Sequence, residues 1–425
     1  MRVLIVNTSE RTGGAAVAAN RLMEALNNNG VKAKMMVRDK DTDSLTVADV
    51  GGGLRSKWHF LWERWCIFCH LHFSREHLFE VDIANAGSDI TGLREFKEAD
   101  IIHLHWINQG MLSLNGIRKI LDSGKPVVWT MHDMWPATAI CHLTLGCRKF
   151  TEGCSHCPLM PRKSPFGDLA RKVWRRKMRI MRTHGRVIFV TCSRWLASDA
   201  KRSKLLEGNK IMSIPNPLDT RTFCPGDKEE ARRVLGLPQG RRLILAVAQR
   251  VSNVNKGMSY LIEACRTLAR LNPSLVGNLG VVMLGGSGEE VASSFDVPAY
   301  PLGYSTDVDK IVAAYRAADL FVTPSLSENL PNTIMEAMAC GIPCVGFNTG
   351  GIPEMIDHRK NGYVAAYKDA EDLARGISWA LSEADYDGLA RNAVRKVSTT
   401  YSQQSVALRY IEVYNQAIAF RHYKL

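Results

Sequence analysis

The segment 320–351 constrains the fold of this chain more than any other segment. It opens with an apolar run, Leu320–Val322, and a polar loop follows. A helical pattern then begins near Pro331 and ends at Gly341, positions that suit a first helical residue and a residue just past a helix end. A second apolar run, Ile342–Phe347, comes next. This order predicts two parallel strands joined by a helix.

The same alternation of apolar runs and helical stretches recurs along both halves of the chain. In the first half the predicted strands are Val3–Asn7, Ala33–Val37, Ile101–His105, Val127–Met131, Val187–Cys192 and Ile211–Ile214. In the second half they are Leu243–Ala248, Val281–Leu284, Leu320–Thr323 and Pro343–Gly346. Strands that alternate with helices indicate an α/β fold with doubly wound parallel sheets. A length of 425 residues favours two such domains.

The boundary between the two domains is expected where Pro215, Asn216 and Pro217 follow one another. Prolines interrupt regular structure, and domain boundaries fall in such segments. The sequence therefore predicts a first domain over residues 1–215 and a second domain that begins at residue 216.

Composition and charge restrict which kind of protein this chain can be and which partners it can bind. With 46% hydrophobic and 23% charged residues, the chain is globular. Its net charge of +13 suits nucleic acid, an anionic membrane or phosphate-rich ligands. No nucleic-acid-binding motif is found, so nucleic acid is not an expected partner. The positive charge concentrates between Arg162 and Arg186, which predicts either a basic helix at a membrane surface or a solvated helix with one face on the core.

Neither a secretory signal nor a membrane span is found in the sequence. The first residues read as a core strand that leads into a glycine loop, and no window approaches the roughly 20 apolar residues of a spanning helix. These features predict a cytoplasmic protein, with peripheral attachment to the inner face of the membrane as an alternative. In that compartment the eleven cysteines are expected to be mostly reduced.

Two glutamates in the segment 320–351 are candidate ligand-binding residues. Glu328 lies in the polar loop, and Glu336 lies about a turn and a half into the predicted helix. Both side chains are expected to face one cleft beside the helix N-terminus. That terminus suits a phosphate, and ionised carboxylates accept hydrogen bonds from vicinal hydroxyls. The arrangement predicts a nucleotide-sugar site; the alternative is a pair of exposed glutamates that flank a helix.

The seven residues between Glu328 and Glu336, with the neighbouring sequences PS, EAMACGIP and GG, resemble the paired-glutamate motif of retaining family 4 glycosyltransferases. The segment IPNPLDTRTF resembles the interdomain segment of this family. The resemblance implies the GT-B fold, two Rossmann-like doubly wound domains that face each other across a cleft. It also implies that residues 216–400 bind the nucleotide-sugar and that residues 401–425 form a helix that crosses back to the acceptor-side domain.

The resemblance assigns roles to residues that would bind the donor. Glu336 would hold the ribose, and Glu328, Asn329 and Leu330 would hold the donor sugar. Arg250 and Lys256 match the family's Arg…Lys-Gly segment and would neutralise the diphosphate; in isolation they read as surface charges. Residues after other strands of the second domain would contact the base, or are ordinary turns: Gly285, Gly303 and Tyr304. Asp307 and Asp309 are predicted to cap a helix rather than to bind a metal ion.

Further roles fall in the first domain. Gly13 and Gly14 follow a strand and open a helix, near the expected donor phosphates and acceptor. His132 takes the place of a family histidine close to the reacting sugar carbon, although a histidine at a strand end is often structural. Asn108, with His103, His105 and Trp106, is expected to contact the acceptor. The implied reaction proceeds with retention of configuration and without a bound metal ion or other cofactor.

Four cysteines within eighteen residues predict a separate feature. Cys141, Cys147, Cys154 and Cys157 match tetrahedral zinc ligation, and two disulfides are the alternative. The segment 141–157 resembles an insertion in a subset of exopolysaccharide glycosyltransferases. A second Cys-x-x-Cys pair, at residues 66–69, lies in an aromatic helical pattern that indicates a membrane-facing or lipid-acceptor surface instead.

The leading interpretation is a hexosyltransferase for cell-surface polysaccharide, such as exopolysaccharide, capsule or lipopolysaccharide. Its donor would be a UDP- or GDP-sugar, and its acceptor a saccharide or a lipid-linked saccharide. Two alternatives use the same fold: a sugar-nucleotide epimerase or phosphorylase-like enzyme, and a non-catalytic nucleotide-sugar-binding protein.

Overall fold

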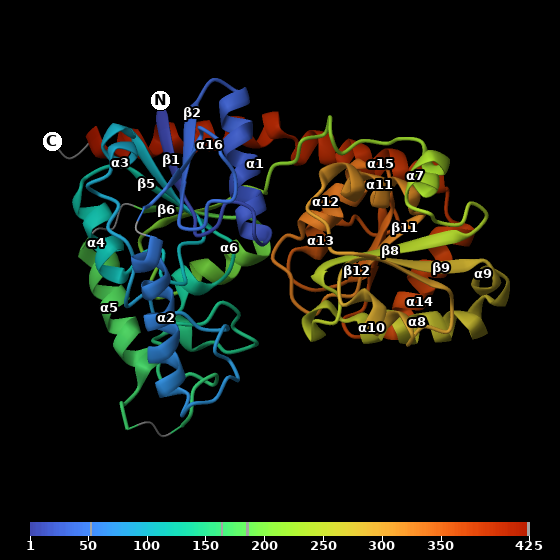
Figure 1. Cartoon of the computed structure of the whole chain (residues 1–425), viewed down its shortest axis with the longest axis horizontal. Helices are drawn as coiled ribbons and strands as arrows, with labels where there is room; N and C mark the ends of the chain where they lie inside the picture. Colours follow the sequence, from blue (N-terminus) through green and yellow to red (C-terminus); the bar gives the residue numbers. More distant parts are fainter. Residues whose placement is uncertain (52, 163–164, 184–186, 423–425) are drawn as a thin grey trace. The chain divides into compact units, whose positions relative to one another are not determined.

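The computed structural model describes residues 1–51, 53–162, 165–183 and 187–422 (Figure 1). The chain divides into two compact units. Unit 1 comprises Met1–Pro215 and Val406–Leu425, and unit 2 comprises Asn216–Ser405. Each unit contains one parallel sheet with helices on both faces. The two doubly wound parallel sheets predicted from the alternation of strands and helices are therefore confirmed.

Seven strands form the sheet of unit 1, in the order β3-β2-β1-β4-β5-β6-β7. Their bounds are β1 Arg2–Val6, β2 Lys32–Val37, β3 Val47–Asp49, β4 Ile101–Leu104, β5 Val127–Met131, β6 Val187–Thr191 and β7 Lys210–Ser213. From β1 the chain proceeds outward to β3 and then returns to place β4 on the other side of β1. The strand order reverses at this point, and parallel sheets bind ligands beyond the carboxyl ends of such neighbouring strands.

Helices cover both faces of the unit 1 sheet. Their bounds are α1 Gly14–Asn28, α2 Gly53–His70, α3 Arg94–Glu98, α4 Leu114–Asp122, α5 Leu169–Thr183, α6 Arg194–Lys201 and α16 Gln403–His422, with short 3₁₀ turns at Trp135–Ala137 and Lys149–Thr151. Val3 of β1 packs against α1 and α16, whereas Leu4 packs with α2, α4 and α5 on the opposite face. Successive residues of a strand point to opposite faces, so β1 supplies both cores.

Six strands form the sheet of unit 2, in the order β10-β9-β8-β11-β12-β13. Their bounds are β8 Arg242–Arg250, β9 Leu279–Gly286, β10 Ala299–Gly303, β11 Leu320–Thr323, β12 Cys344–Phe347 and β13 Gly362–Ala365. Here the strand order reverses between β8 and β11. The carboxyl ends of these two neighbours are therefore the expected ligand position in unit 2.

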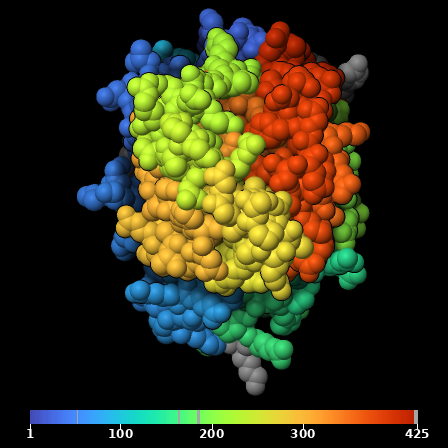
Figure 2. All heavy atoms as spheres, turned by 90° about the vertical axis from the view of Figure 1, so that its right-hand side faces the viewer, coloured from blue at the N-terminus to red at the C-terminus, as the bar shows by residue number. Residues whose placement is uncertain are grey.

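The helices of unit 2 also form two layers (Figure 1). Their bounds are α7 Lys228–Val234, α8 Met258–Leu271, α9 Pro273–Gly277, α10 Gly288–Ala292, α11 Val308–Ala317, α12 Asn332–Ala339, α13 Ile352–Met355, α14 Ala370–Ser378 and α15 Tyr386–Thr400, with a 3₁₀ turn η3 at Val254–Lys256 and a π turn at Trp379–Glu383. Helices α8 and α14 pack together over the core beneath the sheet, and α12 packs with α15. In the space-filling view, the yellow-green start of unit 2 lies beside its red end (Figure 2).

A buried aspartate connects α7, at the start of unit 2, with the sheet of that unit. Asp319, just before β11, is only 2% exposed. Its carboxylate accepts hydrogen bonds from Lys228 of α7 at 2.8 Å, from Arg232 of α7 at 2.7 Å and from the Leu243 backbone N–H at 2.7 Å. The Lys228 ammonium also lies 5.4 Å from the ring centre of Tyr386 in α15. Asp319 therefore links α7 to the sheet through these hydrogen bonds.

Local differences from the predicted elements are small and have physical causes. Helix α12 begins at Asn332, and Pro331 is its N-cap residue rather than its first helical residue. The predicted cap at Asp307 is confirmed, because its side chain accepts a hydrogen bond from the Asp309 N–H. One face of α5 lies in the core while its arginines are exposed, which fits both alternatives predicted for this segment. No helix in the described ranges is long and apolar enough to span a bilayer.

Candidate active site

The carboxyl ends of β8 and β11 bring two predicted residues into contact. Lys256 is the last residue of η3, which follows β8, and Glu328 lies in the loop after β11. The Lys256 Nζ and Glu328 Oε1 atoms are 2.5 Å apart. Both side chains are partly accessible, so a ligand could approach either charge. The contact lies where the strand order of unit 2 reverses.

Gly257 allows η3 to approach the loop after β11. Its φ of +65° lies in the left-handed region, and a Cβ atom at this position would overlap the carbonyl oxygen of Pro324. The Leu326 N–H donates a hydrogen bond of 2.8 Å to the Asn255 carbonyl oxygen, which fixes the approach. A larger residue at position 257 would therefore move Lys256 away from Glu328.

Gly350 and Gly351 also fix the position of the Glu328 backbone. Gly350 has a φ of +55°, and a Cβ atom there would overlap the carbonyl oxygen of Glu328. The Gly351 N–H donates a hydrogen bond of 3.1 Å to the same oxygen. The glycine pair that ends the 320–351 segment therefore positions the loop glutamate.

Glu336 lies in α12, within the same strand–helix–strand unit. It is 7% exposed, and its Oε2 accepts a hydrogen bond of 2.7 Å from the Tyr315 hydroxyl. Among the described residues, no side chain caps the start of α12 at Pro331. Asn329 is half-buried and Leu330 is buried in the turn that precedes the helix.

The other residues predicted for unit 2 lie at the same edge of the sheet but are less closely joined. Arg250 is the last residue of β8 and is exposed; in the part of the chain that the structure describes, it forms no ion pair with Glu328 or Glu336. Gly285, near the end of β9, has a φ of +151°, and a Cβ atom there would overlap the Ala248 carbonyl oxygen. Gly303 ends β10, and the exposed Tyr304 follows it.

In unit 1, a glycine turn follows β1. Gly13 is the N-cap residue of α1 and has a φ of +91°, and Gly14 is the first residue of the helix. Apart from the chain neighbours and the helix's own backbone, a Cβ atom at either position would meet none of the described residues within 4 Å, which leaves space beside the helix start. The Thr8 hydroxyl donates to the Asn108 carbonyl oxygen at 2.9 Å. This contact ties the loop after β1 to the loop after β4.

His132 follows β5 and belongs to a pair of neutral histidines. Its Nε2 lies 2.9 Å from Nδ1 of His105, and its Nδ1 lies 3.6 Å from the Cys192 sulfur. Burial lowers the pKa of His132 to about 4. The imidazole is therefore neutral near pH 7 and can exchange hydrogen bonds without carrying a charge.

Three residues expected to contact the acceptor, Asn108, His103 and His105, are enclosed in the structure. Asn108 is 3% exposed, and its side-chain nitrogen is buried without a hydrogen-bond partner among the described residues. His103 is fully buried and hydrogen-bonded to Tyr414 of α16 and to Thr130, each at 2.8 Å. The expectation that His103 lines a ligand site is wrong, because its side chain points into the core beneath α16.

A charged network around His142 was not predicted from the sequence. Its Nδ1 lies 2.7 Å from Asp133 and its Nε2 lies 2.5 Å from Asp82. Burial opposes the charge of His142, but the two carboxylates outweigh this effect and raise its pKa to about 10. Asp133 also accepts a hydrogen bond of 2.9 Å from the Trp106 indole. The network fixes the residue next to His132.

Comparison with known proteins places the chain in a family. The model of "Glycosyltransferase Family 4" matches residues 12–222, and that of "Glycosyl transferases group 1" matches residues 227–397. The chain belongs to glycosyltransferase family 4. The first match lies within unit 1 and the beginning of unit 2, and the second lies within unit 2.

Several curated members of the family share part of the sequence. A D-inositol 3-phosphate glycosyltransferase of Actinosynnema mirum is 32% identical over 44% of this chain and 47% of its own length. The corresponding protein of Saccharomonospora viridis is 28% identical over 49% of this chain and 51% of its own length. The chain thus spans about half the length of these two relatives. An uncharacterised glycosyltransferase of Methanocaldococcus jannaschii is 26% identical over 80% of this chain and 90% of its own length.

Solved structures share the fold over nearly the whole chain. The Anabaena protein HepE, solved in complex with UDP, superposes with a TM-score of 0.64 at 15% identity, covering 98% of this chain and all of that one. A glycosyltransferase from Rickettsia africae superposes with a TM-score of 0.66 at 15% identity, covering 98% of each chain. At these identities the comparison establishes the fold, which is GT-B, as the sequence predicted.

Proposed function

We propose that this protein is a retaining glycosyltransferase that moves a sugar from a nucleotide-diphosphate-sugar to a saccharide or lipid-linked saccharide. The observation that carries the proposal is the Lys256–Glu328 contact of 2.5 Å beyond the ends of β8 and β11. The strand order reverses there, and parallel sheets bind nucleotides at such positions. Membership of family 4 supports the same activity.

In unit 2, carboxylates would bind the hydroxyls of the donor, and positively charged groups would bind its diphosphate. The Glu336 carboxylate would accept hydrogen bonds from the ribose hydroxyls, while Tyr315 holds the carboxylate in place. Glu328 would bind the donor sugar, together with the backbone at Asn329 and Leu330. Lys256, the start of α12 and Arg250 would face the diphosphate, because all three present positive charge. Gly285, Gly303 and Tyr304 would border the base.

The resemblance to retaining family 4 enzymes implies the transfer step. The acceptor hydroxyl attacks the anomeric carbon from the face that the diphosphate leaves, so the configuration is retained. As the new C–O bond forms, the bond to the diphosphate breaks and its electron pair goes to the leaving phosphate oxygen. The acceptor proton passes to the same phosphate. Lys256 and Arg250 stabilise the charge that develops there, and no metal ion takes part in the step.

In unit 1, the glycine turn and His132, which follows β5, would contact the reacting sugar and the acceptor. The open helix start at Gly13 and Gly14 leaves room for a ligand beside the α1 N-terminus. His132 is neutral, so it would offer a hydrogen bond to the sugar without adding charge next to the reacting carbon. Asn108 would support this region rather than meet the acceptor at the surface, because it is buried.

UDP is the favoured nucleotide. The Anabaena neighbour was solved with UDP and with UDP-glucose, and another neighbour, WaaG, is described as a glycosyltransferase involved in lipopolysaccharide biosynthesis. These similarities support a UDP-sugar donor and a role in cell-surface polysaccharide. Positive groups around a diphosphate would suit UDP- and GDP-sugars equally, so both nucleotides belong in the test.

The test is slow release of UDP or GDP when the protein is incubated with a panel of nucleotide-sugars and no acceptor. We expect one nucleotide-sugar to be hydrolysed above background, since bound water can replace the acceptor hydroxyl. Its hydrolysis should proceed without added Mg²⁺ or Mn²⁺. Absence of nucleotide release and of nucleotide binding across the whole panel would contradict the proposal. Release that strictly requires a divalent ion would contradict only its metal-independent mechanism.

We further propose that unit 1 binds an anionic membrane surface at the cytoplasmic face. Helix α2 exposes Trp58, Trp62 and Trp65, and the neighbouring α5 exposes arginines. A cavity of about 540 Å³ between the two helices is lined by Cys66 and His70 of α2 and by residues of α5 that include Arg176 and Arg179. Helices α2 and α5 lie side by side (Figure 1). Exposed aromatic side chains on one helix and cations on its neighbour suit a membrane interface with anionic headgroups.

Replacing Trp58, Trp62 and Trp65 together with serine should lower binding to vesicles that contain an anionic phospholipid by roughly tenfold or more. Co-sedimentation with vesicles of neutral and of anionic composition measures this change. The matched control replaces two exposed apolar residues of unit 2, Val234 and Leu271, with serine and should leave binding unchanged. Equal binding of the tryptophan variant and the native protein would contradict the proposed surface.

A further inference from the structure

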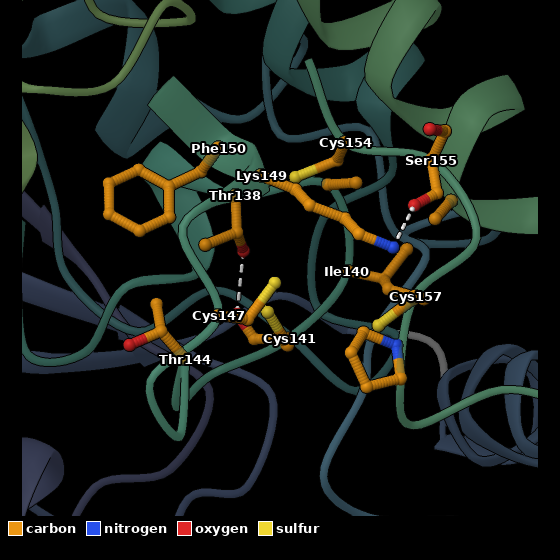
Figure 3. A pocket seen from close by; sticks show the side chains of 13 residues that line it. Thr138, Ile140, Cys141, Thr144, Cys147, Lys149, Phe150, Cys154, Ser155 and Cys157 are labelled. Carbon is orange, nitrogen blue, oxygen red and sulfur yellow. Dashed lines mark hydrogen bonds between the residues drawn. The ribbon is translucent and has the colours of Figure 1, made fainter. Parts of the chain in front are cut away.

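Four cysteines that are spread along the loop after β5 line a single small cavity. Cys141, Cys147, Cys154 and Cys157 border it together with Thr138, Ile140 and Phe150 (Figure 3). All four thiols are half-buried, and in the described part of the chain none of them forms a disulfide. The cavity volume is about 20 Å³, which is room for one ion or one water molecule. The loop has little regular structure besides one 3₁₀ turn, Lys149–Thr151, so something else must fix its course.

Each of the four thiols lies within electrostatic reach of at least two others. Cys141 and Cys157 are hydrogen-bonded to each other. Cys154 interacts with Cys141 and Cys147. Cys157 interacts with Cys147 and Cys154. The loop therefore gathers one complete set of four sulfur donors, the number that a tetrahedral metal site requires.

The flanking histidines do not compete for this role. Both ring nitrogens of His142 are held by Asp82 and Asp133. His156 is largely exposed and lies 3.6 Å from the Asp168 carboxylate. The donor set at the cavity therefore consists of sulfur alone. Thiolates bind zinc in preference to the hard cations magnesium and calcium.

A buried cation lies next to the four sulfurs. Lys177 of α5 is 2% exposed, and its ammonium donates hydrogen bonds to the carbonyl oxygens of Trp135 and Thr138, at 2.7 Å and 3.0 Å. Cys154 and Cys141 are among its electrostatic neighbours, together with Asp133 and Asp82. A buried ammonium is costly unless a negative group lies nearby. Zinc with four thiolates carries a net charge of −2 and would supply that group.

The thiols have not closed around one point. Within the ranges that the structure describes, no three His, Cys, Asp or Glu side chains form a ready-made metal site. Cysteine side chains need only change rotamer to close the gap, because a change of χ1 between staggered positions moves the sulfur by roughly 3 Å. Repulsion between thiolates disappears once a divalent ion lies between them, so metal binding itself favours the closed arrangement.

We propose that Cys141, Cys147, Cys154 and Cys157 bind one zinc ion in a closed, tetrahedral thiolate site that fixes the loop 141–157. The site is structural, because four protein ligands leave no position open for a substrate. Its effect extends beyond the loop. The residue after the first ligand, His142, holds Asp133, so the metal would also stabilise the segment that carries His132.

The chain offers a matched control for this proposal in its second Cys-x-x-Cys pair. Cys66 and Cys69 lie in α2 with the same spacing as Cys154 and Cys157. The full-length protein should contain one zinc ion per chain when it is purified under reducing conditions without added metal. The Cys154→Ser/Cys157→Ser variant should lose at least about nine-tenths of the zinc, whereas the Cys66→Ser/Cys69→Ser variant should keep it. Elemental analysis measures the zinc content of all three proteins.

Cobalt substitution keeps the proposal testable if the ligand variants fail to fold. The native protein loaded with Co²⁺ should show sulfur-to-cobalt charge-transfer absorption and the strong visible bands of a tetrahedral site. Titration of free thiols should find four that become reactive only after a chelator removes the metal. A native protein without zinc whose four cysteines all react, or peptide mapping that finds two disulfides in this loop, would overturn the proposal. Zinc lost from the α2 variant instead would assign the metal elsewhere.

Discussion

Replacing Lys256 with alanine is expected to lower kcat for sugar transfer by roughly 100- to 1000-fold. The lysine would face the diphosphate, where negative charge grows as the bond to the sugar breaks. An interaction that strengthens in the transition state affects kcat and kcat/KM together, so both should fall. Steady-state kinetics with the nucleotide-sugar identified by the release assay would measure the effect.

Two further variants separate this role from a structural one. Lys256→Arg keeps the charge but not the geometry and should recover part of the lost rate. Lys360→Ala removes an exposed lysine of unit 2 and should leave kcat unchanged. Because the Lys256–Glu328 pair is partly exposed, its loss should change the free energy of unfolding by no more than about 1 kcal/mol. Native kcat in the Lys256→Ala variant would rule out the proposed role.

The largest effect on stability is expected at Asp319. Replacing it with alanine should lower the free energy of unfolding of unit 2 by about 3–5 kcal/mol, because the buried Arg232 would lose its ionic partner. The Leu243 N–H and Lys228 would also lose their acceptor. Urea denaturation followed by tryptophan fluorescence measures the change, with Asp296→Ala as the control. Within the described residues, the ion pair of Asp296 with Arg266 is exposed, so its loss should cost less than about 1 kcal/mol.

The pKa of the Asp319 carboxylate indicates how the stability of the fold should depend on pH. Burial alone would raise the pKa of Asp319, but Lys228, the Leu243 N–H and Arg232 together lower it. The folded-state pKa therefore lies below the ordinary value of about 3.9, and the ion pairs stabilise the fold fully above that value. The stabilisation is lost as the pH falls through the folded-state pKa. Stability of the Asp319→Ala variant that declined in acid as steeply as that of the native protein would contradict this account.

Buried parallel strands were the easiest elements to predict from the sequence. Val127–Met131 and Leu320–Thr323 have the predicted bounds, because strands covered on both faces are continuous apolar runs. The edge strands β3, β10 and β13 were not predicted. Their sequences, VAD, AYPLG and GYVA, are short and contain residues that strands disfavour, so only pairing with a neighbour makes them strands.

The sequence could predict those parts of the candidate site whose positions follow from the chain topology. Lys256 and Glu328 are 72 residues apart, yet both follow parallel strands, whose carboxyl ends share one edge of the sheet. The contact of Tyr315 with Glu336 and the contact of His142 with Asp82 were not predictable. Each depends on how a helix or loop packs against a distant segment, and nothing in the local sequence signals the partner. The burial of His103 was missed because α16, which covers it, lies about 300 residues later in the chain.

The most direct test of the proposed site is a crystal structure of the protein with its nucleotide-sugar or with UDP bound. We expect the ribose hydroxyls to lie within hydrogen-bonding distance of Glu336, and the diphosphate to lie beside Lys256 and the start of α12. The Lys256–Glu328 ion pair should then be opened by the ligand. A nucleotide bound away from the ends of β8 and β11, with that ion pair still closed at 2.5 Å, would contradict the proposed site.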